Sequence, residues 1–122
     1  MKFKNPWQEQ VADFHRKFGQ PVGATPDWKR LFTRWYWLDE EVGETYRAQQ
    51  SCNLPEIADG LIDTIYIALG TLVELGVDAD AVFQEVHAAN MRKEQAGPGE
   101  KIRKPAGWVG PDVAGVLRGM GL

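Results

Sequence analysis

The sequence predicts an all-α protein, an antiparallel helical bundle of four main helices plus a short C-terminal helix. Apolar residues recur at helical spacing, and Asn, Asp, Pro and Gly stand where helices characteristically begin and end. No stretch alternates apolar and polar residues as a half-buried strand does. The 122 residues fit one domain, which we expect to span 1–122.

The first two helices are indicated by paired start signals. Asn5 offers a side-chain cap, and Pro6 suits the first helical position, so a helix is expected to begin here and to end at Gly19. Thr25-Pro26 repeats the signal ahead of a long helix over 26–50. This helix carries one apolar stripe, formed by Leu31, Trp35, Leu38, Val42 and Tyr46.

The third helix should begin after Asn53, with Glu56 placed as its capping-box partner, and should stop at Gly76. Its middle, residues 61–73, is apolar around most of its circumference. Such a helix is expected to be central and buried rather than half-exposed.

A fourth helix and a short terminal one complete the prediction. Asp78 can cap a helix over about 79–93, and Pro111-Asp112 can begin the terminal helix. The Gly-, Pro- and Lys-rich residues 95–110 between them are expected to form a loop.

Composition excludes several classes of protein. The net charge of −3 does not suggest a nucleic-acid groove or a membrane surface. The single Cys52 rules out an internal disulfide and fits a reducing compartment. No run of about 18 apolar residues or apolar signal core is present, so we expect a cytoplasmic protein.

Acidic residues form the most informative pattern. Glu41 and Glu44 are three residues apart on the second predicted helix and share one face. On the apolar third helix, the acids at 56, 59 and 63 fall within about 60° of one another. Buried carboxylates need compensation, and Mg²⁺ prefers oxygen ligands and bridges substrate phosphates. The pattern therefore favours a magnesium site that holds a polyphosphate and activates a water molecule.

The same acids fit two other interpretations less well. The glutamates of the second helix can form a solvated face or pair with bases, and Glu56 can be explained by helix capping alone. A di-iron site requires Glu-x-x-His pairs, which neither His15 nor His87 provides.

Three motifs follow one another along the chain: an E-E-x-x-E motif lies at 40–44, a D-x-x-Y-x-x-x-G stretch at 63–70, and an F-x-E-V-H-x-x-N-M-x-K run at 83–93. Taken in order, these three segments resemble the MazG-like superfamily of all-α nucleoside triphosphate pyrophosphohydrolases. The third run, the opening residues 14–19 and the K-P-x-G-W piece at 104–108 are similar to the phosphoribosyl-ATP-pyrophosphohydrolase-like, dUTPase-like branch. The resemblance thus covers nearly the whole chain.

The resemblance implies an enzyme that uses Mg²⁺, with Mn²⁺ as a substitute, to cleave a nucleotide between its α- and β-phosphates. Glu41, Glu44 and Asp63 would be metal ligands, and Glu40 would position or deprotonate the attacking water. The family's second motif is E-x-x-D, whose Glu falls on Gly60 here. We favour Asp59 in its place over Glu56, and the identity of the fourth ligand stays open between them.

Substrate contacts are expected from four cationic or amide side chains and three ring-bearing ones. By resemblance Asn90, Lys93 and Lys104 would hold phosphates. Arg34 would bind a phosphate or pair with the acids, and Tyr66 flanks them. His15 and Phe18 would contact the base or sugar, although core packing is the simpler explanation for Phe18.

The expected role is control of the nucleotide pool, with dUTP or another deoxynucleotide as the leading substrate and a homodimer or higher oligomer as the assembly. Two alternatives are retained: a phosphoribosyl-ATP pyrophosphohydrolase, and a catalytically silent helical module for binding or oligomerisation. Tryptophans at 28, 35 and 37 are expected in the core or in a subunit interface.

Overall fold

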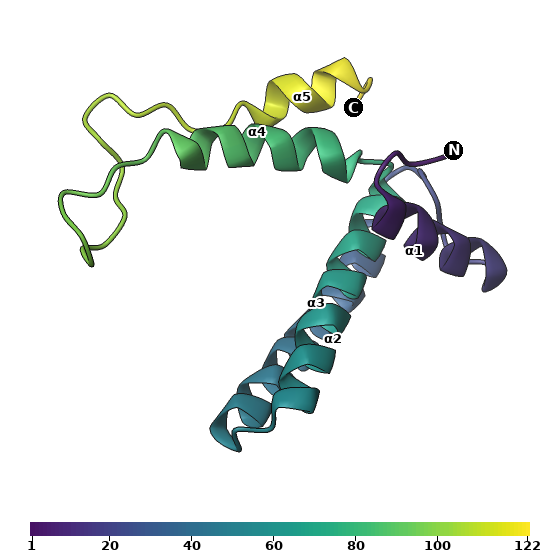
Figure 1. Cartoon of the computed structure of the whole chain (residues 1–122). Helices are drawn as coiled ribbons and strands as arrows, with labels where there is room; N and C mark the ends of the chain where they lie inside the picture. The colour runs from purple at the N-terminus through teal and green to yellow at the C-terminus, as the bar shows by residue number, and fades with distance from the viewer. The chain divides into compact units, whose positions relative to one another are not determined.

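The prediction of an all-α protein is confirmed. The computed structural model describes residues 1–122 and contains five helices and no strand, with a single isolated β-bridge between Glu94 and Arg103 (Figure 1). The helices are α1 (Pro6–Lys17), α2 (Trp28–Gln50), α3 (Leu54–Leu75), α4 (Ala79–Met91) and α5 (Val113–Gly119). They fall into two compact units, residues 1–77 with α1 to α3 and residues 78–122 with α4 and α5.

Local capping explains where most of the helices begin and end. The Asn5 side chain accepts the Gln8 N–H at 2.9 Å at the start of α1. Asp78 caps α4 in the same manner, and Asp112 caps α5. Gly76 ends α3 in the left-handed conformation, at φ +69°. The expected caps at these positions are therefore confirmed.

The start of α2 differs from the prediction by two residues. The helix begins at Trp28 rather than at Pro26, because the side chain of Asp27 accepts the N–H of Arg30 at 3.1 Å. Thr25-Pro26 precedes this cap and lies in the loop. Aspartate is a strong N-cap residue, and it fixes the boundary here.

The first unit is built around α3, which packs against both α1 and α2. Its small core consists of Phe3, Val11, Ala12 and Val73. The loop after α1 is tied to the end of α3, since the backbone N–H groups at 23 and 24 donate to the carbonyls at 73 and 74, at 2.8 and 2.9 Å. The Gln8 amide adds a buried hydrogen bond to the carbonyl of Val77 at 2.7 Å.

The expected burial of the middle of α3 is wrong for the isolated chain, and α2 also exposes apolar side chains. The apolar stripe on α2 is largely exposed at Trp35, Val42 and Tyr46, whereas Arg34, Thr45 and Ala48 are buried. The middle of α3 is central but not enclosed, because Leu61 and Ile62 are about half exposed. Within the first unit, α1 and α2 do not cover all of α3.

No single helix is both long enough and apolar enough to cross a membrane.

Candidate active site

Four carboxylates from α2 and α3 lie close enough to affect one another's charge. Burial is the largest cause of the raised pKa of Glu41, followed by the negative charges of Asp63 and Glu44. The pKa of Asp63 is raised by burial and then by the charges of Asp59 and Glu44. Salt screens the interaction between exposed charges that are more than about 10 Å apart. Because the charges of these carboxylates raise one another's pKa, the side chains belong to one group. We call Glu41, Glu44, Asp59 and Asp63 the carboxylate cluster.

Small residues allow α2 and α3 to approach closely beside this cluster. A Cβ atom on Gly60 would lie only 2.2 Å from Oγ1 of Thr45, so the backbone of α3 contacts this side chain directly. The Thr45 hydroxyl donates to the carbonyl of Glu41 at 2.8 Å, and Ala48 is buried one turn later. Gly60, where the acidic motif was expected to continue, therefore serves helix packing.

One atom of the cluster is both buried and unpaired. Oε2 of Glu41 is the only buried side-chain nitrogen or oxygen atom without a hydrogen-bond partner. A charged oxygen in that position is costly unless a proton or a cation compensates it. The donor set contains only carboxylate oxygens, which fits a hard divalent cation such as Mg²⁺. No three acidic, histidine or cysteine side chains are already grouped as metal ligands, so the carboxylates would have to converge on an ion.

A cleft of about 370 Å³ opens beside the cluster and is lined by Glu44, Arg47, Ala48, Ser51, Glu56, Asp59 and Gly60.

The expected reciprocal capping by Glu56 is wrong. Asn53 caps α3 by accepting the Glu56 N–H at 3.3 Å, but the Asn53 N–H donates to the carbonyl of Ala48 at 3.1 Å. The Glu56 carboxylate is therefore not needed for capping, and it faces the same cleft as Asp59.

Glu40 lies at the edge of the cluster. Its side chain is exposed, and its charge is among the causes that raise the pKa of the neighbouring Glu41. This position leaves its carboxylate open to solvent beside the buried one.

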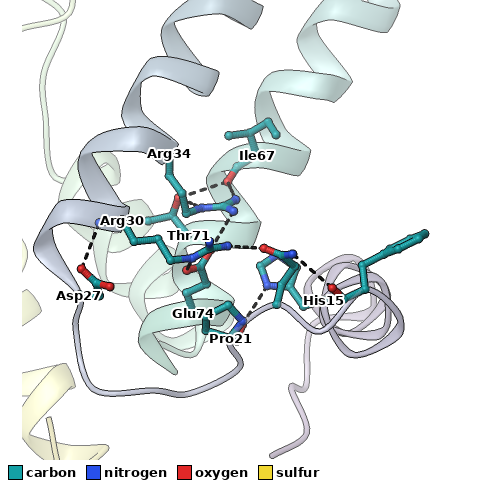
Figure 2. Close-up of polar contacts among 10 residues, drawn as sticks. His15, Pro21, Asp27, Arg30, Arg34, Ile67, Thr71 and Glu74 are labelled. Carbon is teal, nitrogen blue, oxygen red and sulfur yellow. Dashed lines mark hydrogen bonds and ion pairs between the residues drawn. The ribbon is translucent and has the colours of Figure 1, made fainter.

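Arg34 does not pair with the carboxylate cluster. Figure 2 shows it reaching from α2 to Glu74 of α3, where Nη1 lies 2.8 Å from Oε2 and both side chains are only 5% exposed. Its Nε donates to Thr71 at 2.8 Å, and Nη2 donates to the carbonyl of Ile67 at 3.0 Å. Arg30 adds a second ion pair with Glu74 at 2.6 Å. Burial lowers the pKa of Arg34, and the charge of Glu74 opposes this effect.

Glu74 is a residue that the sequence argument missed. It is the buried acid that holds two arginines of α2 and so fixes α2 against α3 at the end opposite the carboxylate cluster. The available signal was a glutamate near the end of an otherwise apolar helix, together with two arginines four residues apart on the preceding helix.

The residues expected to contact base or sugar line one common pocket. Its volume is about 250 Å³, and it is lined by Phe14, His15, Phe18, Gln20, Arg34, Trp37, Tyr66 and Ile67. His15 is buried, and its Nδ1 lies 2.9 Å from the carbonyl of Pro21. A carbonyl only accepts, so this nitrogen carries the hydrogen. We call this site the aromatic pocket.

The aromatic pocket and the carboxylate cluster occupy neighbouring turns of the same two helices. Tyr66 follows Asp63 by three residues, about 4.5 Å along α3, and Trp37 precedes Glu41 by four, about 6 Å along α2. Phe18 is 55% exposed, so it forms part of the pocket wall and not of the core.

The remaining predicted residues lie in the second unit. Asn90 is exposed near the end of α4. The ammonium groups of Lys93 and Lys104 both lie over the ring of Trp108, at 5.6 and 5.0 Å from its centroid. The structure thus brings together two lysines that are eleven residues apart.

Comparison with known proteins relates the chain to a protein family. The family model described as phosphoribosyl-ATP pyrophosphohydrolase matches residues 11–90, which include the carboxylate cluster and every residue that lines the aromatic pocket. No curated protein matches the chain.

Proposed function

The chain belongs to the phosphoribosyl-ATP pyrophosphohydrolase family, and from this premise we propose that it is a Mg²⁺-dependent enzyme that hydrolyses a nucleotide between its α- and β-phosphates. The observation that carries this proposal is the buried, unpaired Oε2 of Glu41 amid three further carboxylates. Such a group carries negative charge that a divalent cation would compensate, and the same cation can bind the phosphates of a substrate.

Glu41, Glu44, Asp59 and Asp63 would hold the metal, and Glu56 is an alternative to Asp59 because both line the adjoining cleft. The bound cation would neutralise negative charge on the phosphates during the reaction. The paired helices supply these ligands from a rigid framework, since Gly60 and Thr45 fix their spacing. Little reorganisation of the backbone is then needed as charge develops.

Glu40 is assigned to orient the attacking water and accept its proton. Its carboxylate is exposed, and it is next in sequence to Glu41, whose Oε2 is buried. A base in this role must reach the attacking water, and an exposed carboxylate at the edge of the cluster can do so.

The aromatic pocket is assigned to the base or sugar of the substrate. It lies one turn from the carboxylate cluster on both helices, and its volume of about 250 Å³ suits part of a nucleotide rather than a whole one. His15, Phe18 and Tyr66 are the residues from the sequence argument that line it. Arg34 closes its inner side and is held there by Glu74.

The family match favours phosphoribosyl-ATP as the substrate. No finding supports dUTP. Phosphoribosyl-ATP carries an adenine base on a triphosphate, and the proposed reaction would release pyrophosphate from it. The adenine would occupy the aromatic pocket, where stacking on aromatic side chains is favourable. Asn90 is assigned to the phosphates.

A second copy of the chain is proposed as the partner of the first unit. Trp35, Tyr46, Leu61 and Ile62 expose large apolar surfaces on α2 and α3. Contiguous surfaces of this kind usually mark an interface in a stable protein.

The decisive experiment measures pyrophosphate release from phosphoribosyl-ATP and from a panel of NTPs and dNTPs that includes dUTP. Each is assayed with Mg²⁺, with Mn²⁺ and with chelator. We expect metal-dependent release from phosphoribosyl-ATP, which Glu41→Gln abolishes. Asp39→Asn is the matched control, since Asp39 is an exposed acid of the same helix that does not contribute to the raised pKa of Glu41.

If pyrophosphate is released only from a deoxynucleotide, that deoxynucleotide and not phosphoribosyl-ATP is the substrate. Absence of release from every nucleotide by folded protein would favour a silent helical module. Full activity of Glu41→Gln would contradict the assigned site.

A further inference from the structure

Gln20 lines the aromatic pocket from the loop that follows α1, and its side chain is partly buried. Its amide makes two hydrogen bonds: Oε1 accepts from Nη2 of Arg30, and Nε2 donates to the carbonyl of Phe18 at 3.2 Å. A guanidinium group only donates and a carbonyl only accepts. Both partners therefore require the same orientation of the amide, with its oxygen towards Arg30.

The guanidinium of Arg30 is held in turn by a buried carboxylate. Figure 2 shows Arg30 at Glu74, where Nε lies 2.6 Å from Oε1 and Nη2 lies 3.3 Å from Oε2. The same carboxylate binds Nη1 of Arg34 at 2.8 Å. Glu74 therefore fixes two side chains of the aromatic pocket, Arg34 directly and Gln20 through Arg30.

Both side chains fixed in this way have hydrogen-bond donors to spare. Nε2 of Gln20 carries two N–H bonds, and only one of them is used by the carbonyl of Phe18. Each terminal nitrogen of Arg34 likewise keeps one N–H beyond its bond to Glu74 or Ile67. A ligand in the pocket can satisfy these donors only with acceptor atoms.

His15 supplies an acceptor beside these donors. In the neutral ring, Nδ1 holds the hydrogen that faces the carbonyl of Pro21 at 2.9 Å, which leaves Nε2 as an acceptor. A Cβ atom on Gly70 would overlap Nη2 of Arg34 and would lie 3.0 Å from Nε2 of His15. The acceptor of His15 and a donor of Arg34 are therefore neighbours over the backbone of α3.

From this arrangement we propose that Gln20 is a specificity-determining residue, whose fixed amide donates an N–H to an acceptor nitrogen of a purine ring. The inference rests on the proposed function, which assigns the base of the substrate to the aromatic pocket. Adenine suits this set of groups, because its ring nitrogens accept hydrogen bonds and its one amino group can donate to His15. Arg30 is a positioning residue, since an amide that is free to rotate would present its oxygen as readily as its N–H.

The test is an NMR titration of the full chain with adenosine and with its 1-deaza, 3-deaza and 7-deaza analogues, in chelator. Each analogue replaces one ring nitrogen by C–H and so removes one acceptor. None of them carries a phosphate, so binding depends neither on a metal nor on the carboxylate cluster. Shifts of the ring signals of Trp37 and Tyr66 would locate the nucleosides in the aromatic pocket.

We expect one of the three analogues to bind wild type about three- to ten-fold more weakly than adenosine, because the N–H of Gln20 then lacks its acceptor. Gln20→Leu should bind adenosine as weakly as wild type binds that analogue, and it should not distinguish the two nucleosides. This double comparison isolates one hydrogen bond. Lys29→Gln is the matched control, since Lys29 is an exposed neighbour of Arg30 on α2, and it should keep the preference of wild type.

Two variants of Arg30 test its positioning role. Arg30→Met releases the amide of Gln20, so adenosine should bind more weakly and the preference over the analogue should be lost. Arg30→Lys keeps a donor for Oε1 of Gln20 and should recover most of the preference. A merely structural arginine would change stability in Arg30→Met without changing the preference among nucleosides.

Adenosine binding that is equal in wild type and Gln20→Leu, with no analogue disfavoured, would overturn the role of Gln20 and leave the proposed function standing. Absence of adenosine binding to folded wild type would overturn both this role and the assignment of the base to the aromatic pocket. An unchanged preference in folded Arg30→Met would overturn the positioning role of Arg30. If Arg30→Met does not fold, Gln20→Leu still decides whether the amide selects the base.

Discussion

The backbone of Gly60 lies against the side chain of Thr45, where a Cβ atom would come within 2.2 Å of Oγ1 and 3.1 Å of the threonine Cβ. Gly60 of α3 and Thr45 of α2 both lie in the packed interface between these helices. The Thr45 hydroxyl donates to the carbonyl of Glu41. The contact sets the spacing of the two helices next to the carboxylate cluster. The contact therefore gives a structural reason for Gly60, which stands where the acidic motif of the family has a glutamate.

Replacing Gly60 with alanine should destabilise the protein and impair the cluster. The added methyl group overpacks the interface, at a cost of about 1–3 kcal/mol in the free energy of unfolding. Chemical denaturation measures this cost. Gly97→Ala is the control, because a Cβ there meets nothing within 4 Å.

The partner substitution provides a sharper check. Thr45→Ala removes the hydroxyl that Gly60→Ala would meet, so the double variant should be more stable than the sum of the two single changes predicts. Additive effects would show that the contact does not limit the approach of the helices.

Neutralising Glu41 should change stability in opposite directions with and without metal. Without metal, Glu41→Gln removes a buried charge that Asp63 and Glu44 repel, so the melting temperature should rise. With Mg²⁺ the wild type should gain stability and the variant should gain much less. Thermal melts in chelator and in Mg²⁺ measure both effects, and equal stabilisation by Mg²⁺ would place the metal elsewhere.

The raised pKa values also predict a pH dependence for the metal-free protein. A carboxyl whose folded pKa lies above its unfolded value, about 4.3 for Glu, binds its proton more tightly when folded. Glu41 and Asp63 should therefore cost stability at neutral pH and lose this cost as the pH falls through their raised pKa values. Denaturation from pH 8 downward should show wild type approaching the stability of Glu41→Gln. A difference that stays constant over this range would argue against the raised pKa of Glu41.

Short-range signals explain which parts of the fold could be predicted. Asn5, Asn53 and Asp78 cap their helices through bonds within three residues, so their effect can be recognised in the sequence. Thr25-Pro26 carried a similar signal, but Asp27 competed for the same helix start and capped it. Boundaries of this kind depend on which of two nearby caps forms.

Contacts between distant segments could not be predicted in the same way. The ion pair between Arg34 and Glu74 joins residues forty positions apart, and no local period reveals it. Gly60 was interpreted as a missing ligand because its contact with Thr45 exists only once α2 and α3 pair. Apolar periodicity also does not distinguish a side chain that faces its own core from one that faces a partner, as exposed Trp35 illustrates.

Removing the charge of Glu74 should be among the most damaging single changes. Glu74→Gln leaves Arg34 buried at 5% exposure without its carboxylate, and breaking a buried pair costs about 3–5 kcal/mol. Glu94→Gln is the matched control, since its pair with Arg103 is exposed and is worth at most about 1 kcal/mol. Urea denaturation of both variants measures the difference. Similar small losses would mean that the Glu74 network contributes little to holding α2 on α3.

The exposed apolar surface of the first unit predicts a dimer that a single charge can break. Trp35 is 57% and Ile62 50% exposed on α2 and α3, and a second copy would bury both. A glutamate at either position would then be desolvated without a partner on association, so Trp35→Glu and Ile62→Glu should sediment at half the wild-type mass. Val109→Glu, at an even more exposed apolar site in the second unit, should sediment as wild type. If the wild-type chain sediments as a monomer at micromolar concentration, the dimer prediction is wrong. Another partner would then cover this surface, because a large exposed apolar surface is unfavourable in water.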